Sequence, residues 1–123
     1  MAAELKTFKA GEILFNEGEP SASLFIVKRG AISIRKKKGS SSVEVGKVTT
    51  GEVMGELSFF DREPRSASAS AIVYSEVLEI KFEELSKIYD TVPDYLKTIM
   101  ASLANRLRKA NETIRQLQKT PTS

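Results

Sequence analysis

The sequence contains no cysteine and no histidine. Without cysteine the chain forms no disulfide bond, and without either residue type it has no tetrahedral Cys/His zinc site. Imidazole bases and thiolate nucleophiles are excluded as well, and most common hydrolase mechanisms depend on one of them. We therefore expect a protein that is not an enzyme and that holds no metal ion.

Long apolar runs are also missing. The opening residues, MAAELKTFKAGE, lack the apolar stretch of a signal peptide. No later run approaches the roughly 20 apolar residues that a helix needs to cross a bilayer. The expectation is a cytoplasmic protein with no membrane partner.

Length and composition describe an ordinary globular chain. Its 123 residues can bury one hydrophobic core, so we predict a single domain over residues 1–123. Hydrophobic residues make up 41% and charged residues 28%, which are typical fractions. The net charge of +3 is compatible with an anionic partner but does not indicate nucleic acid, because acidic and basic residues are interspersed.

Short apolar segments separated by turn-forming residues extend over residues 12–80. The segments are EILF, SLFIVKRGAISIR, VEVGKV and ASAIVYSEVLEI, and the turns between them include NEGEPS, KKKGSSS and TTG. This pattern predicts a mainly β fold, a jelly-roll-like barrel or β-roll over about residues 10–81. Backbone freedom at the turns is expected from Gly18, Gly30 and Gly51.

One segment of the predicted β-roll alternates clearly. In AISIRK, Ile32 and Ile34 fall on one face, and Ser33 and Arg35 fall on the other. A strand with one solvent-facing side has this pattern. The run RKKKGSSS that follows is typical of a solvated hairpin and is not taken as a nucleic-acid site.

Two helices are predicted after residue 81, over about residues 82–119. FEELSKIYD forms the short one, and Pro93 suits the first turn of a long one ending near Lys119. Apolar residues in the long helix recur at spacings of four and three, which is a heptad pattern. They are Leu96, Met100, Leu103, Leu107, Ala110, Ile114 and Leu117. We expect the first half to cover the chain's own core and the second half to form a parallel homodimer.

The segment GELSFFDREPRSASASA, residues 55–71, carries the candidate site. Gly55 allows a tight turn into one turn of helix, whose free N–H groups form an anion site. The helical residues after it are Glu56, Leu57 and Ser58. Arg65 adds a planar, permanently charged fork that suits a phosphate, and Ser66 adds a hydroxyl donor beside it.

The same segment predicts a sugar next to the phosphate. Glu56 would repel a phosphate unless the ligand also offers hydroxyl donors, such as a ribose 2′-OH, while Arg65 keeps Glu56 ionised. The alternative is a surface ion pair of little energetic value. Small side chains leave room for a flat ligand, and these are Ala67, Ser68, Ala69 and Ser70. Phe59 and Phe60 are expected in the core.

These residues resemble the phosphate-binding cassette of the cyclic nucleotide-binding domain family. The family includes domains of bacterial catabolite activators, of the regulatory subunits of cyclic-AMP-dependent kinase and of cyclic-nucleotide-gated channels. The resemblance covers nearly the whole chain: GEILFNEGEPSASLFIVKRGAISI resembles the first strands, GEVMGELSFF the approach to the cassette, and VPDYLKTIMASLANRLRKANETI the long C-terminal helix. GEL alone would be a weak signal, but the three segments together are specific.

The resemblance implies a role for each residue of the site. Arg65 would hold the cyclic phosphate and Glu56 would accept the ribose 2′-OH. The base would be capped from the long helix at Ala110 or Asn111, and we favour Asn111 because its amide offers both a donor and an acceptor to adenine. The expected ligand-binding residues are Gly55, Glu56, Leu57, Ser58, Arg65, Ser66, Ala67 and Asn111.

Two features of the chain depart from the family pattern. Ser66 occupies a position where cyclic-AMP and cyclic-GMP sites often differ, so cyclic AMP is expected but cyclic GMP stays open. The chain has no helix-turn-helix segment after the long helix, so no direct contact with nucleic acid is expected. The predicted function is a cyclic nucleotide sensor in which binding moves the long helix. The alternative is a dimerisation or docking module without a ligand, and an enzyme ranks third.

Overall fold

The computed structural model describes residues 3–119, with side chains up to residue 113. Its backbone contacts divide the chain into two compact units, Met1–Lys87 and Ile88–Ser123. The prediction that residues 1–123 act as one domain stays a prediction. The described strands are β1 (Ala3–Phe8), β2 (Ile13–Phe15), β3 (Ser23–Arg29), β4 (Ala31–Lys38), β5 (Ser41–Thr49), β6 (Val53–Met54), β7 (Ser68–Ala71) and β8 (Ser75–Lys81), and the helices are α1 (Glu56–Asp61), α2 (Phe82–Tyr89) and α3 (Asp94–Lys119).

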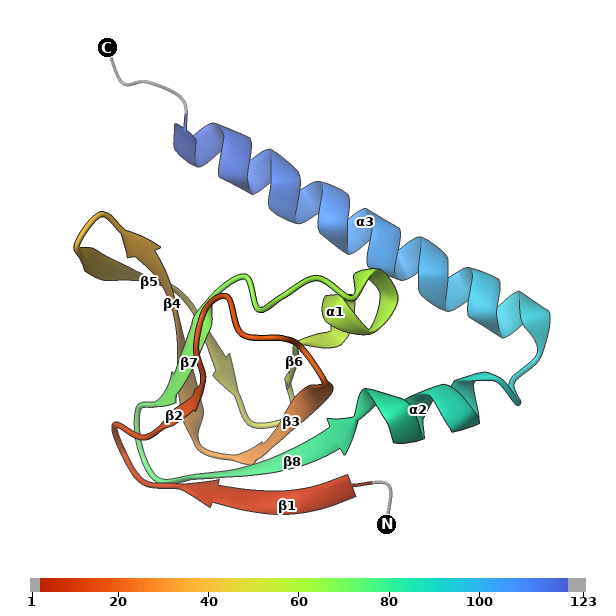
Figure 1. Cartoon of the computed structure of the whole chain (residues 1–123), viewed down its shortest axis with the longest axis horizontal. Helices are drawn as coiled ribbons and strands as arrows, with labels where there is room; N and C mark the ends of the chain where they lie inside the picture. Colours follow the sequence, from red (N-terminus) through yellow and green to blue (C-terminus); the bar gives the residue numbers. More distant parts are fainter. Residues whose placement is uncertain (1–2, 120–123) are drawn as a thin grey trace. The chain divides into compact units, whose positions relative to one another are not determined.

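The first unit is built from two antiparallel sheets (Figure 1). The strand order is β1-β8-β3-β6 in one sheet and β2-β7-β4-β5 in the other. Both sheets contribute buried side chains to one core, which comprises Phe25, Val27, Ile32, Met54, Ala69, Ala71 and Val77. This arrangement confirms the predicted mainly β, jelly-roll-like fold, and the first unit up to β8 is called the β-roll below.

The β-roll begins earlier in the chain than the predicted start near residue 10. β1 pairs with β8 from Ala3↔Ile80 to Phe8↔Ser75, at the edge of its sheet. Its four central side chains are exposed, including the apolar Leu5, so the short alternation at the start of AELKTF does not mark a buried face. Edge strands of this kind are recognised by their pairing, which the sequence does not display.

The segment read as one run, ASAIVYSEVLEI, forms two strands. β7 belongs to one sheet and β8 to the other, and residues 72–74 bend between them. Gly30 lies against this corner, where an added Cβ would come within 2.7 Å of Ser75 Cβ. The chain changes sheets here, which closes the core between the two layers.

The prediction that Ser33 faces solvent is wrong. Ile32 is fully buried as expected, but Ser33 is only 6% exposed. β4 lies between β7 and β5, so its polar face is flanked by neighbours on both sides. The Ser33 hydroxyl donates to Glu44 Oε1 at 2.6 Å, which satisfies the buried oxygen.

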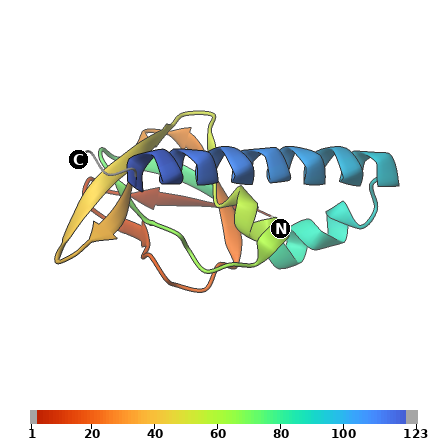
Figure 2. The ribbon, with the colours of Figure 1, turned by 90° about the horizontal axis from the view of Figure 1, so that it is seen from above.

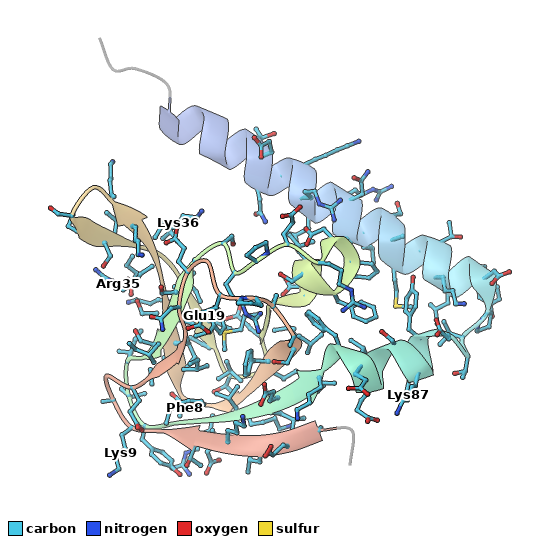
Figure 3. All side chains as sticks on the ribbon, in the orientation of Figure 1. Phe8, Lys9, Glu19, Arg35, Lys36 and Lys87 are labelled. Carbon is cyan, nitrogen blue, oxygen red and sulfur yellow. The ribbon has the colours of Figure 1, made fainter. Side chains whose placement is uncertain are left out.

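The predicted hairpin at RKKKGSSS is confirmed by the pairing of β4 with β5, which ends at Lys38↔Ser41. Its tip residues are exposed, and Figure 3 shows Arg35 and Lys36 on this hairpin. Arg35 donates from Nε to Ser42 Oγ at 3.0 Å. These contacts hold a solvated turn together without any ligand.

The second unit contains α3, a continuous helix (Figure 2). The helix begins at Asp94, so Pro93 lies one position before its predicted place in the first turn, and its carbonyl accepts from the amide of Leu96 at 3.0 Å. Four side chains of the predicted heptad are exposed: Leu96, Leu103, Leu107 and Ala110. The side chains of Ile114 and Leu117 lie outside the described residues. No helix in the described part of the chain is long and apolar enough to span a membrane.

Candidate functional site

Arg65 is held in place through its backbone. It lies in the connection from α1 to β7, and its amide donates to Glu19 O at 2.8 Å while its carbonyl accepts from Gly18 N at 2.8 Å. Glu19 lies in the loop between β2 and β3 (Figure 3). The left-handed Gly18, with φ of 89°, lets this loop turn back toward the cassette. The loop therefore fixes where the Arg65 side chain begins.

The guanidinium group of Arg65 is buried and only partly satisfied. The residue is 7% exposed, and its Nη2 donates to the carbonyl oxygen of Ser23 at 2.8 Å. Its Nη1 is buried without a hydrogen-bond partner. Buried polar groups in native proteins nearly always have a partner, so an unpaired charged donor indicates a site for an acceptor. This geometry excludes the alternative of a surface ion pair for Arg65.

Two aromatic rings support the same group. Arg65 Cζ lies 4.3 Å from the centre of the Phe15 ring and 5.5 Å from that of Phe25, and the two rings stack 5.7 Å apart. Burial lowers the pKa of Arg65, and the nearby carboxylates of Glu79 and Glu19 oppose that shift. Arginine stays protonated in proteins, so the site carries a desolvated positive charge.

Gly55 lies directly against this charge. Its φ is 84°, it precedes the first residue of α1, and no side chain caps that helix. A Cβ on Gly55 would lie 2.7 Å from Arg65 Nη1 and 3.3 Å from Ser23 O. The structure thus brings Gly55 and Arg65 together, as the sequence predicted, and leaves no room there for a larger residue.

The predicted contact residues in and after α1 differ in exposure. Glu56, Leu57 and Ser58 are half-buried in α1, Ser66 is exposed, and Ala67 is buried. Among the residues that the structure describes, no ion pair or hydrogen bond joins Glu56 to Arg65. Glu56 is therefore left to interact with another group, and its proposed role with the sugar stays a prediction.

The small residues of β7 only partly fit the prediction that their side chains leave room for a ligand. Ala69 and Ala71 belong to the hydrophobic core, so the expectation that Ala69 leaves room for a ligand is wrong. β7 pairs with β4, where Ile34 lies opposite Ala69, and the bulky neighbour needs a small residue beside it. Ser68 accepts a hydrogen bond from Glu17 N at 2.8 Å and so helps hold the β2–β3 loop.

A contact at the end of α1 was not found from the sequence. Arg62 has φ of 58°, the only positive φ of a non-glycine residue among those described. Its Cζ lies 5.2 Å from the Phe59 ring and 5.1 Å from the Phe82 ring, and its Nη2 donates to Ser86 Oγ at 3.3 Å. Phe59 is buried and Phe60 half-buried, in line with their predicted core role. Through these contacts the Arg62 side chain connects the end of α1 with α2.

Asn111 was predicted to face the base of the ligand. It lies on α3 in the second unit, and its side chain is exposed. Its contact with a base stays a prediction. Across the described residues, no group of three or more acidic, histidine or cysteine side chains forms a metal site.

The comparisons with known proteins agree on one family. A family model described as the cyclic nucleotide-binding domain matches residues 5–92. A CRP-like cAMP-activated global transcriptional regulator of Mycobacterium tuberculosis is 28% identical over 111 residues, which cover 89% of this chain and 50% of the regulator. A cAMP-dependent protein kinase regulatory subunit of Mycosarcoma maydis is 34% identical over 68 residues, covering 55% of this chain and 13% of the subunit.

Solved structures show the same fold. The catabolite activator protein of Thermus thermophilus matches with a TM-score of 0.77 and 26% identity, over 95% of this chain and 55% of that protein. The N-terminal domain of a transcriptional regulator from Streptomyces coelicolor matches with a TM-score of 0.75 and 27% identity, over 92% of this chain and 80% of that domain. This chain spans about half the length of the bacterial regulators it matches.

Proposed function

The chain belongs to the cyclic nucleotide-binding domain family, and from that membership we propose that its β-roll binds cyclic AMP as a regulatory ligand. The Arg65 guanidinium supplies the central observation: it is buried, and its Nη1 has no partner in the described structure. A cyclic phosphate carries one negative charge and offers acceptor oxygens, so it would satisfy both the charge and the donor.

The other cassette residues complete the proposed site. The missing side chain at Gly55 lets a ligand oxygen approach Nη1, and the amides of Leu57 and Ser66 add donors for the phosphate. Ser58 and Ala67 complete the surface around it. Glu56, half-buried and without an ion pair to Arg65, accepts the ribose 2′-OH.

The descriptions of two relatives support cyclic AMP as the ligand. The M. tuberculosis regulator is described as cAMP-activated, and a T. thermophilus relative that is 29% identical over 107 residues is described as a cyclic AMP receptor protein. Ser66 itself does not decide between the two bases. We assign the adenine edge to Asn111, whose amide matches its donor and acceptor.

Direct titration tests this proposal. Isothermal calorimetry with cyclic AMP and with cyclic GMP should show saturable binding of one nucleotide per chain, tighter for cyclic AMP. The ligand should also raise the thermal unfolding temperature, because it binds only the folded state. If neither nucleotide gives heat or a thermal shift, the ligand-free docking module becomes the better account.

Binding is proposed to move α3, because a contact between Asn111 and the base would exist only in a closed arrangement. Spin labels on β4 and α3 report this movement as a change in their distance on adding cyclic AMP. An unchanged distance distribution at saturating ligand would contradict the coupling. No catalytic step is assigned to the chain.

The exposed heptad side chains of α3 are proposed to form a parallel homodimer. Sedimentation of the wild type should show a dimer, and Leu107→Glu should shift it toward monomer because a charge replaces an apolar seam residue. Asn105→Glu adds the same charge on the opposite side of the helix and should stay dimeric. A monomeric wild type would contradict this part of the proposal.

A further inference from the structure

Polar side chains from the three adjacent strands β1, β8 and β3 form a row on one sheet, and this row ends at Arg65. The register places Lys6 of β1 opposite Val77 and Ser23 of β3 opposite Lys81, with Glu79 of β8 between them. Side chains at alternate positions of paired strands share a face. Lys6, Glu79 and Ser23 are therefore diagonal neighbours on one face.

The three side chains are linked by short contacts. Lys6 Nζ lies 2.5 Å from Glu79 Oε1, and Ser23 Oγ donates to Glu79 Oε2 at 2.6 Å. The carbonyl oxygen of the same Ser23 accepts from Arg65 Nη2 at 2.8 Å. One residue thus separates the carboxylate of Glu79 from the proposed phosphate-binding guanidinium.

Glu79 is ionised in this environment. Burial raises the pKa of its carboxyl, but the hydrogen bonds from Lys6 and Ser23 together with the nearby positive charges outweigh that effect and leave the pKa below its usual value. Its side chain is 14% exposed, so water screens its charge weakly, whereas the Lys6 side chain is 43% exposed. Glu19 is the other carboxylate that acts on Arg65, and it is exposed.

Glu79 and a bound phosphate have the same sign of charge. Without ligand, the Glu79 carboxylate offsets part of the buried positive charge of Arg65. With ligand, the two negative charges repel each other through a poorly screened interior. Lys6 reduces this repulsion because it forms an ion pair with Glu79.

We propose that Glu79 lowers and Lys6 raises the affinity of the Arg65 site for an anionic nucleotide, so that one ion pair on the β1–β8 edge sets the binding strength. The inference rests on the proposed function and adds to it two positioning and charge-setting residues outside the cassette. Neither Lys6 nor Glu79 is required to touch the ligand.

Two single substitutions test the opposite signs. Glu79→Gln keeps an acceptor for Ser23 and removes the charge, and we expect cyclic AMP to bind about three- to ten-fold more tightly, from Coulomb's law at a protein-like dielectric constant. Lys6→Met removes the ion-pair partner of Glu79 and should weaken binding about two- to five-fold. This effect is smaller than that of Glu79→Gln because Lys6 is partly solvated. Lys6→Arg keeps the charge and should restore the wild-type Kd.

Matched controls separate this local effect from a change in net charge. Glu76→Gln removes the same charge on β8 but from the opposite face, and Lys28→Met removes an exposed lysine of β3. Both should bind cyclic AMP within about two-fold of the wild type, since screening weakens their effect. In the double variant Lys6→Met/Glu79→Gln, the effect of Lys6 should disappear, because its partner charge is gone.

The sign of the change decides between the charge mechanism and simple structural support. Structural support alone would make Glu79→Gln bind more weakly than the wild type or equally well, and either outcome for Glu79→Gln would overturn the inference while the proposed function stands. Circular dichroism at the titration temperature confirms that each variant is folded, and Lys6→Gln replaces Lys6→Met if the latter is not. Failure of the wild type to bind either cyclic nucleotide would overturn the proposed function and this inference together.

Discussion

Gly55 and Arg65 meet at a distance that only glycine permits: a Cβ on Gly55 would lie 2.7 Å from Arg65 Nη1. The left-handed φ of 84° at Gly55 adds a second reason for glycine. The contact joins the start of the cassette to its charged group. Even the methyl group of an alanine at position 55 would therefore disturb the site.

Gly55→Ala should weaken cyclic AMP binding by about ten-fold or more and lower the free energy of unfolding by about 1 to 2 kcal/mol, because alanine in this conformation is strained and crowds Nη1. Calorimetry and urea unfolding measure the two effects. Gly51→Ala is the matched control, with φ of 89° and no atom within 4 Å of the added Cβ. It should lose stability but keep its affinity, and equal losses of affinity in both variants would contradict the role of Gly55.

Arg65→Ala should reduce the free energy of cyclic AMP binding by about 2 to 5 kcal/mol, because a buried phosphate would lose its charged partner. Arg65→Lys should recover only part of this loss, because lysine lacks the planar fork and cannot reproduce both Nη contacts. Calorimetry at constant salt measures both. Equal binding by the wild type and Arg65→Ala would remove the site assignment.

Glu56→Ala should reduce the binding free energy by about 1.5 to 3 kcal/mol, since the ribose 2′-OH would lose its acceptor. The same variant should distinguish cyclic AMP from 2′-deoxy cyclic AMP less well than the wild type does. Titrating both nucleotides into both proteins gives a thermodynamic cycle. An unchanged preference for the 2′-OH would show that Glu56 contacts another part of the ligand or none.

Arg62 combines a strained backbone with two ring contacts. Arg62→Ala should lower the free energy of unfolding by about 1 to 2 kcal/mol through loss of the contacts with Phe59 and Phe82. Arg62→Gly loses the same contacts but relieves the left-handed backbone at φ of 58°, so it should be about 1 kcal/mol more stable than the alanine variant. Urea unfolding of the two variants compares them, and equal stabilities would contradict the strain.

The Lys6–Glu79 pair should make stability depend on pH at both extremes. The pKa of Glu79 is lowered from 4.5, so the stability that it adds is present above pH 4.5 and is lost as pH falls through the folded pKa. The pKa of Lys6 is raised from 10.5, so its contribution is present below pH 10.5 and is lost as pH rises through the folded value. Urea unfolding between about pH 3 and 7 should show a shallower acid decline for Glu79→Gln than for the wild type. Parallel curves would contradict this assignment.

Much of the fold was readable from the sequence because its signals are local. Alternating residues and turn glycines predicted the β-roll, Pro93 and the heptad predicted α3, and Gly55 and Arg65 stood out within one short segment. Those properties depend on near neighbours in the chain. Ser33 was misread because its burial depends on Glu44, which reaches it from the neighbouring strand β5.

By itself, the sequence determined the chemistry that is available: a guanidinium and a carboxylate in one segment, no thiol and no imidazole. Only the tertiary structure decided that Arg65 is buried over Phe15, that its Nη1 lacks a partner, and that Ser23 links the Arg65 guanidinium to the Glu79 carboxylate. These relationships join strands distant in the chain. Burial and charge coupling arise from such long-range contacts, because the local dielectric environment is created only when the sheets come together.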